Sequence, residues 1–237
     1  MTAKKSAAFI MIHGQGTNKE FSHVELFDNL KSELDNSDDI LFHPIKYYSD
    51  IQERQYDLMD RMPKFGWLRK LRSKLVNAFG DSATIKGSNQ NYKDVMQIFR
   101  KNIIDVRSKI APNAPIFIMG HSLGAVLLSN FLWDMQQVGI YDSQIKGIFT
   151  TGNPSYIFNS GLKRIVPIQK TQRHFFWINF WNKKDVISSP LRPFSREYRD
   201  LVVDVRVKKG FPIFAHGKYD SDKKVYKRIA AKMKLFL

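Results

Sequence analysis

The fold is decided by one continuous segment, Ile116-Phe117-Ile118-Met119-Gly120-His121-Ser122-Leu123-Gly124-Ala125-Val126-Leu127. Pro115 precedes an apolar run that predicts a buried strand, and an apolar helix is expected over residues 123–138. Between them lies the pattern Gly-x-Ser-x-Gly, with Ser122 at its centre. In this context the serine hydroxyl stands exposed above a sheet, while Gly120 and Gly124 leave room where a Cβ would collide with neighbouring backbone. The alternative is an ordinary tight turn in which the serine is only a helix N-cap.

The composition limits the class of protein. A chain of 237 residues with 43% hydrophobic content suits one α/β domain, or such a domain with a small insertion. It has no cysteine, which excludes disulfides and thiol chemistry and fits a reducing compartment. The net charge of +16 favours contact with a polyanion, whether membrane phospholipid, nucleic acid or an acidic partner.

The apolar run Ala7–Ile12 follows two lysines and ends in His13-Gly14. Its six residues are too few for the apolar core of a secretory signal, which needs about 7–15, so the run is interpreted as the first strand. No stretch approaches the ~20 apolar residues that a membrane span requires. We therefore expect a cytoplasmic protein, with peripheral attachment to a membrane surface as an open alternative.

Strand and helix patterns alternate along most of the chain. Further strands are expected at 40–47, 145–151, 174–181 and 201–207, and helices at 22–34, 92–110 and 222–237. Pro44 predicts that the second strand lies near an edge of the sheet or ends early. The alternation predicts an α/β fold with a mostly parallel sheet of about six strands and helices on both faces. Ligands of such sheets bind beyond the carboxyl ends of the strands.

The alternation of strand and helix patterns is interrupted at residues 49–91. This segment is too long for an ordinary connection, so it predicts a helical insertion within a single domain, 1–237. Within it, apolar and basic residues alternate at helical spacing: Trp67, Leu68, Arg69, Lys70, Leu71, Arg72, Lys74 and Leu75. A basic amphipathic helix with an aromatic residue at its start is typical of membrane-surface binding. The competing interpretation is a lid whose apolar side covers the active site, and the two are compatible.

Several polar and glycine residues follow the predicted strands at the carboxyl edge. The first strand ends in His13-Gly14-Gln15-Gly16, and the strand at 145–151 ends in Gly152-Asn153. In a nucleophile turn of this kind, an oxyanion is held by one N–H from the loop after the first strand and by the N–H that follows the nucleophile. The candidates are Gln15 and Leu123. We expect substrate contacts from the other edge residues, His13, Gly14, Gly16, His121, Gly152 and Asn153. A glycine-rich loop that cradles phosphate is the alternative for the first of these turns.

A serine nucleophile needs a base, and the base needs a carboxylate that fixes its tautomer. Of the six histidines, only His216 lies in a loop after the last predicted strand. The carboxylate should lie between serine and histidine in chain order. Asp185 directly follows the preceding strand, whereas other acids lie in or near a helix or the last strand (Asp134, Asp142, Glu197, Asp200 and Asp204).

Together these features resemble the α/β-hydrolase superfamily over nearly the whole chain, and Gly-His-Ser-Leu-Gly is similar to its lipase-like members. The chain departs from the family in starting directly at the strand that carries His13-Gly14 and in its insertion. The resemblance implies a serine hydrolase that cleaves a carboxylic ester through an acyl-enzyme on Ser122, with His216 as base and Asp185 as its partner. It implies no metal or organic cofactor.

Three alternatives stay open. A thioesterase or acyltransferase would use the same fold, and a non-catalytic binding protein would keep only the scaffold. A nucleic-acid or membrane-surface protein would follow from the charge, although no known nucleic-acid motif is present. The expected partners are a small-molecule or lipid ester and an anionic membrane surface, with no specific nucleic acid. The sequence does not fix the acyl chain, the leaving group or the oligomeric state.

Overall fold

The computed structural model describes residues 4–13, 23–46, 90–139, 142–155, 175–185, 187–208, 210 and 215–237. Nearly all of the predicted insertion at 49–91, including the basic stretch from Trp67 to Leu75, therefore lies outside the described residues. The oxyanion candidate Gln15 and the neighbouring Gly14 and Gly16 lie outside them too.

The described strands form one sheet of six parallel strands in the order β2-β1-β3-β4-β5-β6. In chain order these strands are β1 (Ala7–Ile12), β2 (Ile40–Ile45), β3 (Ile116–His121), β4 (Ile145–Thr151), β5 (Phe176–Asn182) and β6 (Val202–Val207). The predicted parallel sheet is confirmed. The expectation that Pro44 lies in an edge strand is also confirmed, because β2 ends the sheet on one side.

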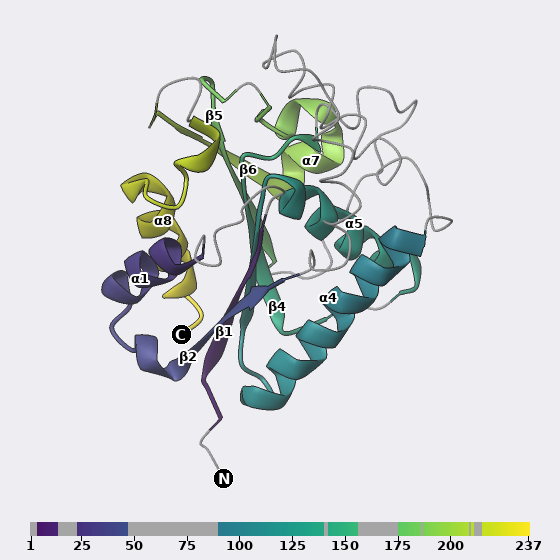
Figure 1. Ribbon diagram of the computed structural model, residues 1–237, viewed down its shortest axis with the longest axis vertical. Helices are drawn as coiled ribbons and strands as arrows, with labels where there is room; N and C mark the ends of the chain where they lie inside the picture. Colours follow the sequence, from purple (N-terminus) through teal and green to yellow (C-terminus); the bar gives the residue numbers. More distant parts are fainter. Residues whose placement is uncertain are drawn as a thin grey trace, which may run out of the picture.

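Helices cover both faces of the sheet (Figure 1). One face carries α1 (Val24–Glu33) and α8 (Lys223–Met233), and the other carries α4 (Gln90–Lys109), α5 (Leu123–Gln137) and α7 (Arg196–Leu201). Short 3₁₀ turns lie at Ser37–Asp39, Arg192–Phe194 and Ala215–Gly217. The helix α7 was not predicted, because six residues are too few to show a helical period; its N-cap is Ser195, whose hydroxyl accepts from the Tyr198 N–H.

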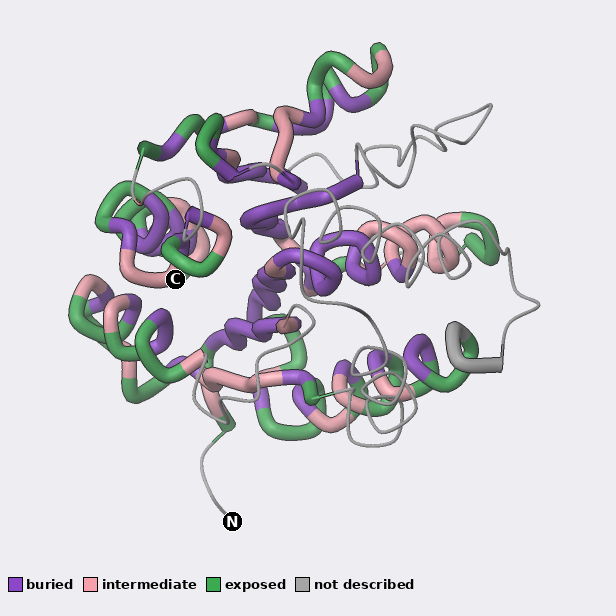
Figure 2. Tube along the Cα trace, turned by 45° about the horizontal axis from the view of Figure 1, so that its top comes forward, coloured by how far each residue is buried: buried purple, intermediate pink, exposed green. Residues whose placement is uncertain are grey.

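The two faces of β1 show why its sequence is apolar throughout. Ala8, Ile10 and Ile12 join the core under α4 and α5, while Phe9 and Met11 join the core under α1 and α8. A strand buried on both sides cannot alternate apolar with polar residues. Figure 2 shows these buried central strands between helices whose outer sides are exposed.

All six strands run in the same direction, so their carboxyl ends lie at one edge of the sheet. Every helix within the described residues is too short or too polar to cross a bilayer.

Candidate active site

The turn between β3 and α5 holds Ser122 in a strained conformation. Its backbone has φ 54° and ψ −122°, and it is the one non-glycine residue with positive φ among the residues that the structure describes. The Ser122 N–H donates to the carbonyl of Thr151 at the end of β4, with 2.9 Å between nitrogen and oxygen. Such strain persists only where the surroundings enforce it, and it commonly marks a functional site.

The two glycines of the pattern are required by close packing. A Cβ on Gly120 would lie 2.6 Å from the carbonyl oxygen of Gly124 and 2.7 Å from the Cα of Ala125. A Cβ on Gly124 would collide with the backbone carbonyls of Ile12 and His13 at the end of β1. The helix α5 therefore starts in contact with the loop that follows the first strand, as the sequence pattern predicts.

Three side chains from separate loops form a continuous hydrogen-bonded chain. His216 Nε2 lies 2.8 Å from Ser122 Oγ, and His216 Nδ1 lies 2.8 Å from Asp185 Oδ2. Asp185 comes from the turn after β5, and His216 from the 3₁₀ turn Ala215–Gly217. The structure thus brings together Ser122, Asp185 and His216, the three side chains for which the sequence predicts the roles of nucleophile, acid and base.

The protonation of this chain follows from its carboxylate. Burial acts to raise the pKa of Asp185, but hydrogen bonds from His216 and Tyr219, the charge of His216 and the Ile187 N–H outweigh it and hold the pKa below its ordinary value. An ionised carboxylate only accepts, so His216 Nδ1 carries a proton, and whenever Nε2 carries none it can accept from the Ser122 hydroxyl. That is the arrangement a general base requires.

Tyr219 completes the surroundings of the carboxylate. Its hydroxyl donates to Asp185 Oδ2 at 2.9 Å, while the Ile187 N–H donates to Oδ1 at 3.2 Å. Tyr219 is 2% exposed, and burial together with the charge of Asp185 raises the pKa of its phenol. Tyr219 is not predicted by the sequence, because a tyrosine three positions after a histidine belongs to no recognisable motif.

The imidazole of His216 is held between two other edge residues. The ring of His121 lies 4.9 Å from it, centroid to centroid, and His121 Nδ1 shares a 3.1 Å hydrogen bond with Thr151 Oγ1. On another side lies Gly152, with φ +56°, where an added Cβ would lie 2.8 Å from His216 Cε1. Burial and the neighbouring His216 lower the pKa of His121 to about 3, so His121 is neutral around pH 7.

The other predicted edge residues have different surroundings. The ring of His13 lies 5.4 Å from that of His23, and burial with the charge of His23 lowers the pKa of His13 to about 4. Asn153 is fully buried, and its Oδ1 accepts from the N–H and the hydroxyl of Ser155. Contacts of His13, His121, Gly152 and Asn153 with substrate stay predictions.

One predicted oxyanion donor lies within the described residues. The N–H of Leu123 belongs to the first residue of α5, where backbone N–H groups have no partner within the helix and the positive end of the helix dipole lies. No described residue accepts a hydrogen bond from it. Its role as an oxyanion donor stays a prediction. Among the described residues, no group of three or more His, Asp or Glu side chains is placed to hold a metal ion.

Comparison with known proteins identifies the fold. No protein-family model matches the sequence, and no curated protein matches it. The structure is similar to an arylesterase (TM-score 0.56, 10% identity, covering 99% of this chain and 76% of the other). It is also similar to Est1E from Butyrivibrio proteoclasticus (TM-score 0.55, 12% identity, covering 98% of this chain and 90% of the other). A third similar structure is an esterase from Pyrobaculum calidifontis (TM-score 0.54, 11% identity, covering 100% of this chain and 80% of the other). The chain thus has the α/β-hydrolase fold, as the resemblance predicted.

Proposed function

We propose that the protein is a serine hydrolase that cleaves a carboxylic ester through an acyl-enzyme on Ser122. The observation that carries this proposal is the chain of two 2.8 Å contacts from Ser122 Oγ through His216 to Asp185. A serine hydroxyl is a poor nucleophile until a base takes its proton, and the base must hold the correct tautomer. The contacts from Asp185 and His216 meet both requirements.

The proposed reaction begins when Ser122 Oγ attacks the ester carbonyl carbon and its proton passes to His216 Nε2. The negative charge then develops on the carbonyl oxygen, where the Leu123 N–H, and the Gln15 N–H that the sequence predicts, donate hydrogen bonds. His216 returns the proton to the departing alkoxide as the C–O bond breaks. Water, deprotonated by the same imidazole, attacks the acyl-enzyme and releases the acid and free Ser122.

Two observations beyond the contacts themselves support the proposal. Ser122 has a strained backbone in the turn at the carboxyl edge of the sheet, which is where such a turn carries a nucleophile, although the residue is only 4% exposed. The compared structures are named as esterases, and their names support an ester as the substrate class. A small-molecule or lipid ester is accordingly the proposed substrate.

A fluorophosphonate probe tests the proposed nucleophile. The wild-type protein should be labelled, and labelling should disappear in Ser122→Ala. A matched control is Ser129→Ala: Ser129 lies in α5, its hydroxyl donates to the Ala125 carbonyl, and its variant should be labelled like the wild type. A folded wild-type protein that is not labelled, or equal labelling of Ser122→Ala, would contradict the proposal and favour a non-catalytic binding protein.

The leaving group is tested on the same protein. p-Nitrophenyl esters of increasing acyl length, matched acyl thioesters and an added alcohol acceptor are compared by kcat/KM and by product analysis. Faster turnover of the oxygen esters with release of free acid supports the proposed reaction. A preference for thioesters, or transfer to the alcohol, would instead show the thioesterase or acyltransferase alternative.

A further inference from the structure

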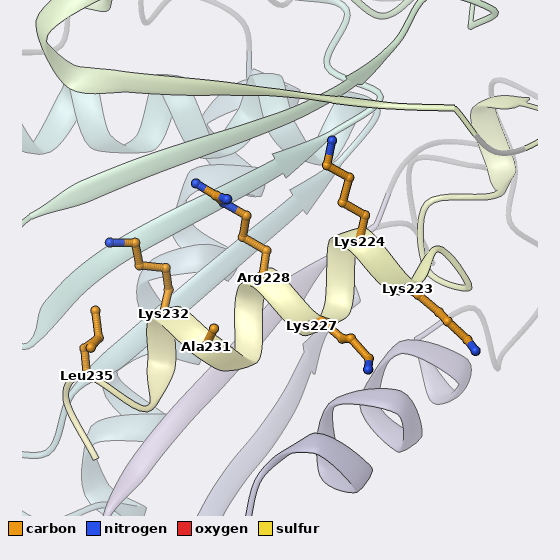
Figure 3. A pocket seen from close by; sticks show the side chains of 7 residues that line it. All are labelled: Lys223, Lys224, Lys227, Arg228, Ala231, Lys232 and Leu235. Carbon is orange, nitrogen blue, oxygen red and sulfur yellow. The ribbon is translucent and has the colours of Figure 1, made fainter.

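The outer side of α8 is densely cationic. From Lys223 to Leu237 the chain contains six lysines and arginines and no acidic residue. An open groove of about 640 Å³ runs along this side, and its lining includes Lys223, Lys224, Lys227, Arg228, Lys232 and Leu235. Figure 3 shows that Lys224, Arg228, Lys232 and Leu235 project from one side of the helix, and Lys223 and Lys227 from the other.

Two of the six cations have an acidic partner within the part of the chain that the structure describes: Lys227, and Lys234, whose Nζ lies 3.1 Å from Asp35 Oδ2 at the exposed surface. Lys227 Nζ lies 3.7 Å from Glu33 Oε1, a separation that gives a weak pair between partly exposed groups. Among the described residues, no acidic side chain lies within ion-pair distance of Lys224, Arg228 or Lys232. By contrast, Arg107 of α4 pairs with Asp142 on the other face of the sheet.

Exposed apolar side chains accompany these cations. Leu235 is 70% exposed and Leu237 is 54% exposed, although α8 turns its own apolar side, including Val225, Ile229 and Met233, into the core. Folding of the described residues therefore leaves the two leucines uncovered. Cations beside exposed leucines match a surface with phosphate groups above an apolar layer.

We propose that the outer side of α8, with Leu235 and Leu237, docks onto an anionic lipid surface. Its cations would lie over lipid phosphates while the leucines enter the boundary between headgroups and acyl chains. A nucleic acid would use the cations but not the leucines, since bases are bound by aromatic stacking and base-edge hydrogen bonds. None of these residues belongs to the group around Ser122, so the surface is independent of the proposed chemistry.

Vesicle binding tests the proposal with the full chain. Sedimentation is measured with vesicles of phosphatidylcholine alone and with vesicles that also contain phosphatidylserine. The wild type should bind only the second kind. Each cation near such a surface contributes about fivefold in affinity, so the triple variant Lys224→Gln, Arg228→Gln, Lys232→Gln should bind about a hundredfold more weakly. It should keep wild-type circular dichroism and wild-type turnover of a soluble ester.

A matched control removes the same charge elsewhere. The triple variant Lys93→Gln, Arg100→Gln, Lys101→Gln takes two lysines and one arginine from exposed positions of α4, on the opposite face of the sheet. It should bind vesicles within about fivefold of the wild type. An equal loss in both triple variants would show that net charge alone drives binding. Undiminished binding of the α8 variant would assign the lipid contact to another surface. Either result overturns the proposal.

The leucines separate a lipid surface from another polyanion. Leu235→Ser should weaken binding to the phosphatidylserine vesicles about tenfold, because the leucine can no longer leave water, while elution from heparin stays unchanged. If Leu235→Ser leaves vesicle binding unchanged, the lipid proposal is wrong. A single-stranded oligonucleotide that binds α8 more tightly than the vesicles do would assign the surface to nucleic acid instead.

Discussion

Gly152 leaves the space beside the imidazole of the proposed base free of a side chain. A methyl group there would lie 2.8 Å from His216 Cε1 and 3.0 Å from its Nδ1, whereas ordinary contact begins at 3.4 Å. In Gly152→Ala the imidazole must therefore shift by about 0.6 Å. The shift lengthens the 2.8 Å contacts of His216 with Ser122 and Asp185. Since misplacement by about 1 Å can cost about a hundredfold, we expect kcat/KM to fall roughly ten- to hundredfold.

A second glycine separates steric displacement from backbone strain. Gly139 also has positive φ, at +66°, but an added Cβ there meets nothing within 4 Å. Both Gly152→Ala and Gly139→Ala should lose about 1–2 kcal/mol in the free energy of unfolding, since alanine disfavours the left-handed conformation. Hydrolysis of p-nitrophenyl acetate and urea unfolding are measured for both variants. Equal kcat/KM values for the two would refute the argument that Gly152 positions His216.

Two further substitutions test Tyr219 and His121, which lie beside the proposed base and its carboxylate. Tyr219→Phe removes the donor to Asp185 Oδ2 and should lower the free energy of unfolding by about 1.5–3 kcal/mol at pH 7. Folding lowers the pKa of Asp185, so this stabilisation is present above the carboxyl's unfolded pKa and is lost as the pH falls through the folded pKa. If Tyr219→Phe leaves the midpoint of urea unfolding at pH 7 unchanged, the predicted loss of stability is wrong. His121 has a folded pKa of about 3, so below pH 6.5 the unfolded chain takes up a proton that the folded chain does not. As the pH drops from 6 to 4, the free energy of unfolding of the wild type should therefore fall more steeply than that of His121→Asn, by up to about 1.4 kcal/mol per pH unit. If the two proteins show the same pH dependence, His121 is not held neutral in the folded protein.

The sequence by itself determined the strands and the turn that carries Ser122. Apolar runs such as Ala7–Ile12 are short, continuous and bounded by glycine or proline, so their local pattern is enough to mark buried parallel strands. The turn around Ser122 can be predicted without knowledge of distant residues, because its glycines and the flanking strand and helix lie within twelve consecutive residues. Chain order after the predicted strands also placed Asp185 and His216 at the same edge.

Only the tertiary structure decided how the site is supported. The Tyr219 hydroxyl donates to Asp185, which lies 34 positions earlier in the sequence. Gly152 lies beside the imidazole of His216, which is 64 positions later in the sequence. Such contacts depend on the register of β4, β5 and β6 and on where the loops after them turn, which local periodicity does not encode. The sequence shows that the last predicted helix contains cations and leucines. Only the packing of the apolar side of α8 against the sheet shows that these residues lie together on the exposed side. A helical pattern shows which residues share a face, whereas packing decides which face is covered.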